Sequence, residues 1–133
     1  MALQYVMDSD ILIHLQRGNP LVCEKFAAIP SAQFCTTIIS HAEVHVGVYR
    51  REDNRRVRAF YERLFARLPV LPFDEKAAHE FARIKAMLLL EGRKMHDMDI
   101  AIAAIAMTHR LTLVTNNARD FHRVPGLKLQ SWN

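Results

Sequence analysis

The sequence predicts an α/β fold with a mainly parallel central sheet flanked by helices. Short apolar and β-branched segments alternate along the chain with segments of helical periodicity. This alternation is typical of parallel strands joined by crossover helices. The 133 residues match the commonest size of one domain. We therefore expect residues 1–133 to form a single domain around one core.

The first half of the chain predicts strand, helix, helix, strand, helix. Residues 3–7 are an apolar run, and the helical pattern after them ends at residues 18–20, where a proline suits the start of a second short helix. Residues 34–39 are rich in β-branched side chains and predict the second strand. Ser40 and Glu43 match the S-x-x-E capping box, so the next helix is expected to begin at Ser40.

Residues 50–67 hold most of an amphipathic, arginine-rich helix. Five apolar residues form one stripe at helical spacing: Val57, Phe60, Tyr61, Leu64 and Leu68. The segment has seven arginines and three acidic residues, so it carries the whole formal excess charge of +4. Arginine offers a planar fork to phosphate, which makes this segment a candidate surface for nucleic acid or an acidic partner. A solvated helix face is the alternative.

The second half continues the alternation. Two prolines within residues 68–73 favour a short or edge strand. Asp74 is placed to cap a long helix that reaches Glu91, with Gly92 at its end. Residues 98–108 are apolar nearly all round and predict a buried helix. The remaining expected elements are a strand at 111–115, a turn at 116–120 and a short strand at 127–132.

Targeting signals and disulfides are not expected. No apolar run approaches the roughly 20 residues of a transmembrane helix, and Gln4 and Asp8 stand where a signal peptide would be apolar. Cys23 and Cys35 are too few for a disulfide framework, and we expect both to be reduced and buried. The sequence therefore predicts a cytoplasmic protein without a membrane partner.

Four acidic residues fall near the carboxyl ends of predicted strands, where ligands gather in such sheets. Asp8 follows the first strand, Glu43 lies in the first turn of the helix after the second, and Asp120 lies in the turn after residues 111–115. Asp99 opens the buried helix. Clustered carboxylates repel one another unless a cation neutralises them, and oxygen ligands favour Mg²⁺ or Mn²⁺. Such a site can activate water for attack on a phosphodiester.

Four acidic residues in these segments also have a simpler structural interpretation. Asp10 is accounted for as an N-terminal helix residue, and Asp97 as the N-cap of the buried helix. Glu43 could serve only the capping box, and Asp120 only a turn. The metal hypothesis therefore depends on the shared placement of the set at strand ends.

Four motifs resemble those of PIN-domain proteins. Residues 7–13 (MDSDILI) resemble their opening D-[TS]-[ND]-hydrophobic motif, and residues 42–47 (AEVHVG) resemble A-E-hydrophobic-x-x-G. Residues 99–106 (DIAIAAIA) are similar to D-x-x-I-A-A. Residues 114–121 (VTNNARDF), with RVPGL behind them, resemble the ending of the virulence-associated protein C (VapC) toxins. The four motifs occur in order over nearly the whole chain, which makes them specific together.

The resemblance implies a single PIN-like domain that acts as a metal-dependent endoribonuclease toxin of a type II toxin–antitoxin module. It implies Mg²⁺ as cofactor, with Mn²⁺ able to substitute, a homodimer, and inhibition by a small VapB-type antitoxin. The acidic quartet maps onto Asp8, Glu43, Asp99 and Asp120, and polar site residues map onto Thr115 and Asn117. Where many relatives read I-G-x-x-D, residues 95–99 read MHDMD, which adds His96 and Asp97 at the rim.

The expected mechanism uses one or two Mg²⁺ or Mn²⁺ ions, held by the acidic quartet, to position a water for in-line attack on an RNA phosphodiester. Asp8 and Asp99 are expected to bind the metal directly, and Glu43 to bind through water or to orient the nucleophile. Thr115 and Asn117 are expected to hydrogen-bond the scissile phosphate or a ligand carboxylate. The sequence leaves open which RNA is cleaved.

Three other functions each have a feature of the sequence in their favour. His41 and His45 have the spacing of a zinc-binding helix, but the glutamate of H-E-x-x-H directly follows the first histidine, whereas Glu43 comes one residue later. The run DSD at residues 8–10 is similar to the nucleophile motif of haloacid dehalogenases, which requires a larger scaffold. The third is a catalytically inert α/β module that binds RNA or protein through the arginine-rich helix. Such a module has no need of clustered carboxylates.

Overall fold

The fold is a five-stranded parallel sheet with helices on both sides, which confirms the predicted class. The computed structural model describes residues 2–133. The strands are β1 (Tyr5–Met7), β2 (Phe34–Thr37), β3 (Val70–Leu71), β4 (Thr112–Val114) and β5 (Leu129–Gln130). The helices are α1 (Ser9–Gln16), α2 (Pro20–Ala28), the 3-10 turn η1 (Ser31–Gln33), α3 (Ile38–Tyr49), α4 (Arg55–Arg67), α5 (Glu75–Leu90), α6 (Asp97–Thr108) and α7 (Ala118–Phe121).

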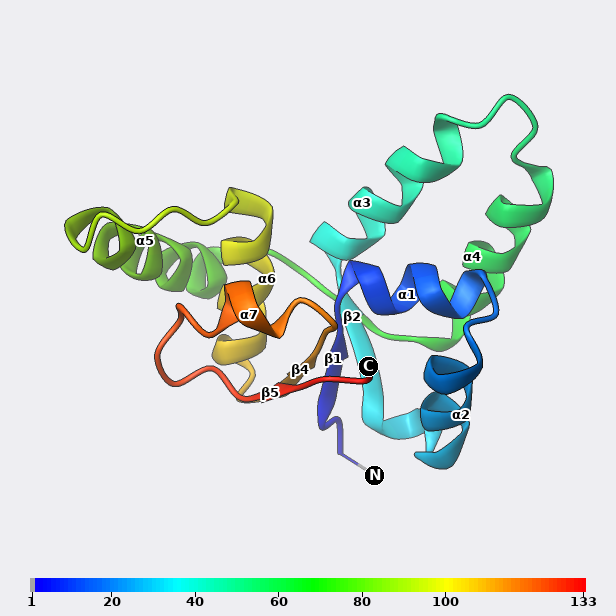
Figure 1. Ribbon diagram of the computed structural model, residues 1–133, viewed down its shortest axis with the longest axis horizontal. Coiled ribbons are helices and arrows are strands. Elements are labelled where there is room, and N and C mark those ends of the chain that lie inside the picture. Colours follow the sequence, from blue (N-terminus) through cyan, green and yellow to red (C-terminus); the bar gives the residue numbers. More distant parts are fainter. Residues whose placement is uncertain (1) are drawn as a thin grey trace.

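The strand order β3-β2-β1-β4-β5 places the first strand in the middle of the sheet. The chain builds outward from β1 through β2 to β3 and then returns to the other side of β1 for β4 and β5 (Figure 1). In register, Tyr5 lies beside both Phe34 and Thr112, so β1, β2 and β4 end at the same edge. The order reverses between β1 and β4, which is where ligands bind in such sheets.

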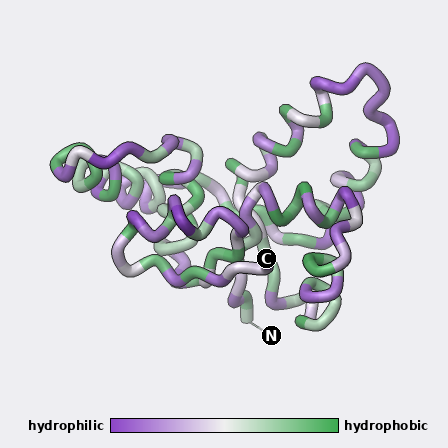
Figure 2. The backbone as a smooth tube through the Cα atoms, in the orientation of Figure 1, coloured by the Kyte–Doolittle hydropathy of each residue, from purple (hydrophilic) through white to green (hydrophobic). Residues whose placement is uncertain are grey.

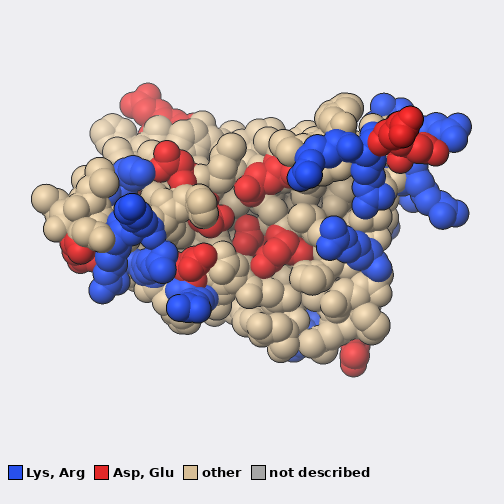
Figure 3. All heavy atoms as spheres, turned by 45° about the horizontal axis from the view of Figure 1, so that its top comes forward, with Lys and Arg blue, Asp and Glu red and all other residues tan. Residues whose placement is uncertain are grey.

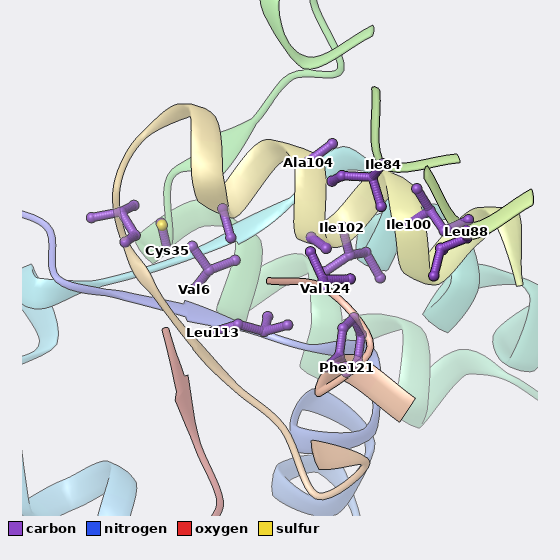
Figure 4. Packing of buried hydrophobic residues seen from close by; sticks show 13 residues of the cluster. Val6, Cys35, Ile84, Leu88, Ile100, Ile102, Ala104, Leu113, Phe121 and Val124 are labelled. Atoms are coloured by element: carbon purple, nitrogen blue, oxygen red, sulfur yellow. The ribbon is translucent and has the colours of Figure 1, made fainter. Parts of the chain in front are cut away.

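Two apolar clusters hold the helices against the sheet. One joins β1 and β4 to α5, α6 and α7 and includes Val6, Leu113, Ile102 and Phe121 (Figure 4). The other joins the sheet to α1–α4 and includes Met7 and Val114. Figure 2 shows hydrophobic segments along the strands and a hydrophilic loop between α3 and α4. The two clusters fix β1, β4 and their following residues from both sides.

The two cysteines are both free, as expected, but they differ in burial. Cys35 lies within the first apolar cluster, and its burial raises the pKa of the thiol to about 12. Cys23 only packs against the second cluster and is half-buried, so the expectation of full burial was wrong for this residue.

The middle of helix α6 is fully buried, as its sequence predicts. Every residue of α6 from 100 to 106 is buried. Because the α6 backbone is packed on all sides, Asp99 in its first turn has a fixed position. None of the helices in residues 2–133 is long and apolar enough to cross a membrane.

The start of α3 differs from the expectation. β2 ends at Thr37 and α3 begins at Ile38, so the predicted strand was too long and the predicted capping box at Ser40 and Glu43 was wrong. Thr37 is the N-cap, because its side-chain oxygen accepts a hydrogen bond from the Ser40 backbone N–H at 3.0 Å. Glu43 consequently lies in the second turn of α3 rather than the first.

The later elements are shorter than expected. β3 is a two-residue edge strand, in line with its prolines, and β5 covers only Leu129 and Gln130 of the predicted 127–132. Trp132 instead is buried against Phe34, with ring centroids 5.7 Å apart. Asp120 lies in the short helix α7, not in a turn.

Candidate active site

Asp8 stands at the carboxyl end of β1 and caps α1. One carboxylate oxygen accepts a hydrogen bond from the Ser9 N–H at 2.8 Å, and the other accepts one from the Thr115 hydroxyl at 2.7 Å. The side chain is nearly inaccessible, with 4% of its surface exposed. Burial, helped by the negative charge of Asp10 and Asp99, raises the pKa of Asp8 to about 7. A cation at this position would therefore be favoured.

Asp10 belongs to the same group, although the sequence pattern predicted only a helix-terminal role for it. It is in the first turn of α1, but its Oδ2 accepts a hydrogen bond from the Asn116 N–H at 3.0 Å, across the sheet edge. Its Oδ1 is buried and has no hydrogen-bond partner within residues 2–133. Burial raises the pKa of Asp10. The sequence did contain an indication that Asp10 belongs to this group, because Asp10 is the second aspartate of the DSD run at residues 8–10.

Glu43 and Asp99 approach from α3 and α6. The Ser9 hydroxyl donates to Glu43 Oε1 at 2.5 Å and so ties α3 to α1. Burial raises the pKa of Asp99, and the charges of Glu43, Asp120 and Asp10 act in the same direction, while His96 opposes them. Asp99 therefore interacts electrostatically with four other carboxylates, those of Glu43, Asp120, Asp10 and Asp8.

The segment after β4 supplies the two polar residues and the last carboxylate. The buried Thr115 hydroxyl, which donates to Asp8, accepts a hydrogen bond from the Asn117 N–H at 2.9 Å. The Asn117 side-chain amide donates to Asp120 Oδ2 at 3.1 Å. The Thr115 hydroxyl thus contacts Asp8 and, at 3.4 Å, Asp10 Oδ2, while Asn117 contacts Asp120; the catalytic roles of Thr115 and Asn117 stay predictions.

All six predicted site residues, joined by Asp10, lie at one edge of the sheet. Figure 3 shows acidic side chains near the middle of this face, with basic side chains on either side. Within residues 2–133, no three His, Cys, Asp or Glu side chains form a ready-made metal cage. Mg²⁺ does not need one, since it is usually bound through one or two carboxylates and keeps several waters. The unpartnered Asp10 Oδ1 and the mutually repelling carboxylates fit a hard divalent cation.

The histidine pair on α3 has a structural role instead. His45 Nδ1 lies 2.6 Å from the His41 carbonyl oxygen, and the two rings have centroids 4.3 Å apart. Both rings also contact Phe65 on α4. This geometry is that of an aromatic cluster between α3 and α4, so it gives no support to a zinc-binding helix.

The residues at the rim of α6 also differ from expectation. Asp97 was predicted to cap α6, but His96 occupies the N-cap position and makes no side-chain capping hydrogen bond. Asp97 is the first residue of the helix, and its Oδ1 pairs with Lys85 Nζ at 2.7 Å. Asp97 therefore pairs with Lys85 and is not one of the carboxylates that meet at the edge of the sheet.

The arginine-rich segment does not form one surface. Helix α4 begins only at Arg55, and Arg50 and Arg51 in the preceding loop line a hollow that also contains Glu43. Arg55 pairs with Asp53 at 3.3 Å. Farther along, Arg63 and Arg67 border an apolar groove between α2 and α4. Of the seven arginines in the segment, only Arg50 and Arg51 line the hollow that contains Glu43.

Comparison with known proteins identifies the class. The family model described as PIN domain matches residues 5–127, so the doubly wound sheet with its acidic edge is that of a PIN-domain protein. Ribonuclease VapC2 of Haemophilus influenzae is 34% identical over 130 residues, which cover 98% of each chain. The tRNA(fMet)-specific endonuclease VapC of Shigella flexneri is 29% identical, over 98% of this chain and 99% of its own.

A solved structure agrees with these relatives. The chain in the crystal structure of DNA-bound VapBC from Salmonella typhimurium has a TM-score of 0.92 and 30% identity, covering 98% of this chain and 99% of that one. The protein belongs to the VapC family of PIN-domain proteins. The resemblance found in the sequence motifs is thereby confirmed, while the roles of single site residues stay predictions.

Proposed function

We propose that this chain is the toxin of a type II toxin–antitoxin module, an endoribonuclease that hydrolyses RNA phosphodiester bonds with the help of a divalent cation. The observation that carries the proposal is the meeting of carboxylates from α1, α3, α6 and α7 at the switch point of the sheet. Both hydrogen-bond donors to Asp8 are neutral, so they leave its negative charge unbalanced. A bound metal cation would neutralise this charge.

The relatives support the substrate and the partner. The similar Haemophilus influenzae protein is named a ribonuclease, and the Shigella flexneri protein a tRNA(fMet)-specific endonuclease. The similar solved structure is a VapBC complex, which supports a VapB-type antitoxin as partner of this chain. Cellular RNA as substrate implies action in the cytoplasm. Formation of a homodimer stays a prediction, which light scattering of the purified protein would test.

The proposed roles follow from the contacts. Asp8 and Asp99 would hold Mg²⁺ or Mn²⁺, assisted by Asp10 and Asp120. When bound, the ion supplies positive charge that acidifies water and stabilises the charge developing on the phosphodiester. Thr115 holds the Asp8 carboxylate in place, and Ser9 does the same for Glu43. Glu43 is thereby positioned to orient an attacking water.

The test is cleavage of a purified RNA pool by the wild type, Asp8→Asn and Asp99→Asn, each with Mg²⁺, Mn²⁺ or EDTA. We expect cleavage with either metal, none with EDTA, and at least about a 100-fold loss in each variant, the upper end for residues that support a metal site. Asp53→Asn is the matched control, because it makes the same chemical change at an exposed residue paired with Arg55.

Two outcomes would reject the proposal. Cleavage that survives EDTA, or that survives both substitutions, would exclude the metal mechanism. RNA binding without scission under every metal condition would favour an inert binding module. The antitoxin has a separate test: a short protein encoded beside this chain should co-purify with it and block its toxicity.

A further inference from the structure

A second hollow adjoins the carboxylates on the side of α7. The turn between α5 and α6 and the end of α7 enclose about 500 Å³. Its lining includes four cationic side chains, those of Lys85, Arg93, Lys94 and Arg123, and one carboxylate, that of Asp120. We call this hollow the α5–α6 basic pocket. Because Asp120 belongs both to the pocket and to the candidate active site, the two are continuous.

This cluster is produced by the fold and is not visible in the charge pattern. Outside residues 50–67 the chain has equal numbers of basic and acidic residues, so the sequence predicts a neutral remainder. The fold nevertheless brings Lys85 from α5, Arg93 and Lys94 from the turn after it, and Arg123 from the end of α7 to one place. His96, at the start of α6, lines the same pocket and interacts electrostatically with Asp99.

The cations are only partly neutralised within the protein. Lys85 is paired with Asp97, and the Arg93 Nε lies 3.5 Å from Glu91 Oε2 with about half of the Arg93 side chain exposed. Arg123 donates to the Lys94 carbonyl at 2.7 Å, which fixes the turn against α7. Within residues 2–133, the exposed Lys94 side chain makes no ion pair. Arg93 and Lys94 are therefore available to an anion from outside.

The wall of the pocket is apolar. Leu88, Met95 and Ile100 line it below the cations, and its volume falls within the roughly 300–1,000 Å³ of small-ligand sites. A basic rim over an apolar wall matches a nucleotide, whose phosphate needs cations and whose sugar and base offer apolar surface. An acidic protein segment would satisfy the rim but would not explain why the pocket is continuous with the carboxylates.

Electrostatics also favour RNA at this place. A strand whose scissile phosphate reaches the carboxylates must leave its neighbouring phosphate within range of the same negative charges. That neighbour is repelled unless the protein provides cations where it lies. The α5–α6 basic pocket provides them on the Asp120 side, as Arg50 and Arg51 do on the Glu43 side.

We propose that the α5–α6 basic pocket binds the nucleotide next to the scissile bond on the Asp120 side, with Arg93 and Lys94 on its phosphate. The pocket is thus a substrate-positioning site whose contacts hold RNA in register with the carboxylates. This inference rests on the proposed ribonuclease function.

The experiment compares the wild type with Arg93→Gln/Lys94→Gln. The matched control is Lys76→Gln/Lys128→Gln, which removes the same charge from two exposed residues outside the pocket. The probe is a fluorescein-labelled single-stranded RNA of mixed sequence. The measurements are KM and kcat with Mg²⁺, and Kd over a range of KCl concentrations, the latter with Asp99→Asn added to each protein to prevent cleavage.

We expect the pocket variant to raise KM and Kd about tenfold and to leave kcat within about twofold. The slope of log Kd against log salt should fall by about 0.7 for each phosphate that the variant no longer binds. The control should match the wild type in all these quantities, and the melting temperature of both variants should be unchanged because the replaced side chains are exposed.

The outcomes separate this inference from the proposed function. If the wild type cleaves RNA and the pocket variant keeps its KM and salt slope, the pocket is not an RNA site and only the inference fails. A pocket variant with a lower kcat and an unchanged KM would also overturn the inference. If RNA binding is unchanged but the co-purified antitoxin binds more weakly, the pocket serves a protein partner and the inference is wrong. If the wild type neither binds nor cleaves RNA, the proposed function fails together with the inference.

Discussion

Asp8 is held by neutral donors in a buried position, and this determines the chemistry of the site. The Thr115 hydroxyl and the Ser9 amide fix both of its oxygens but bring no full positive charge. The motifs around Asp8 and Asp99 predicted where these residues stand, at the start of α1 and in the first turn of α6, while their roles stay predictions. Asp10 could not be separated from a helix-terminal acid, because an acid in a first helical turn is already favourable through the helix dipole. Its hydrogen bond to the Asn116 amide depends on tertiary structure.

Asp10→Asn tests whether that residue acts with the others. The change keeps the shape of the side chain and removes a charge that acts on Asp8 and Asp99. We expect RNA cleavage to fall by about 10-fold to 100-fold, the range for groups that support a metal site. Asp53→Asn, at an exposed residue paired with Arg55, is the control. Equal cleavage by Asp10→Asn and the wild type would contradict the role assigned to Asp10.

The raised pKa of Asp8 predicts how stability depends on pH in the absence of metal. The pKa is about 7 in the folded protein against an ordinary value of 3.8, so between these values the folded state binds more protons than the unfolded state. The contribution of Asp8 to the free energy of unfolding is therefore fully present below pH 3.8 and is lost as the pH rises through 7. The pKa values of Asp10 and Asp99 shift in the same direction.

Urea unfolding in EDTA between about pH 4.5 and about pH 8, a range that begins above the lower pKa and ends above the higher one, measures this effect. We expect the Asp8 contribution to decline by a few kcal/mol toward pH 8. Asp8→Asn should flatten that part of the profile, and Mg²⁺ should restore stability at the alkaline end. A wild-type profile no steeper than that of Asp8→Asn would show that the buried charge has no such effect.

At the scale of elements, the start of α3 shows where sequence patterns are insufficient. Residues 36–39 are all β-branched, so a strand that continues through Ile39 was the natural expectation. Thr37 and Ser40 are both good capping residues, and only the hydrogen bond from the Ser40 amide to Thr37 decides between them. The shift matters for the site, because it places Glu43 in the second turn and within reach of Ser9.

Two substitutions distinguish the caps. Thr37→Val keeps the volume of the buried side chain and removes the capping oxygen, so it should lower the free energy of unfolding by about 1 kcal/mol. Ser40→Ala should cost less, since Ser40 lies inside the helix and alanine has the higher helix propensity. Chemical denaturation of both variants measures the difference. A larger loss of stability for Ser40→Ala than for Thr37→Val would instead indicate that Ser40 is the N-cap of α3.

At the scale of the whole molecule, the parallel sheet explains why the site residues meet. Alternating strands and helices predicted the sheet, and the switch point between β1 and β4 brings together residues that are more than a hundred positions apart, such as Asp8 and Thr115. The distribution of charge was predicted less well. The excess of +4 does lie within residues 50–67, but cations from α5, its following turn and α7 gather beside Asp120 only in the folded chain.

We propose that the carboxylates at the switch point act through a divalent cation in RNA hydrolysis. The most direct measurement is the single-turnover rate of RNA cleavage as a function of Mg²⁺ concentration, for the wild type, Asp99→Asn and the Asp53→Asn control. We expect a rate that rises with Mg²⁺ and saturates, equal for the wild type and Asp53→Asn. For Asp99→Asn we expect a midpoint at least about tenfold higher or no cleavage. A rate that does not depend on Mg²⁺, or one that is the same for Asp99→Asn, would contradict this claim.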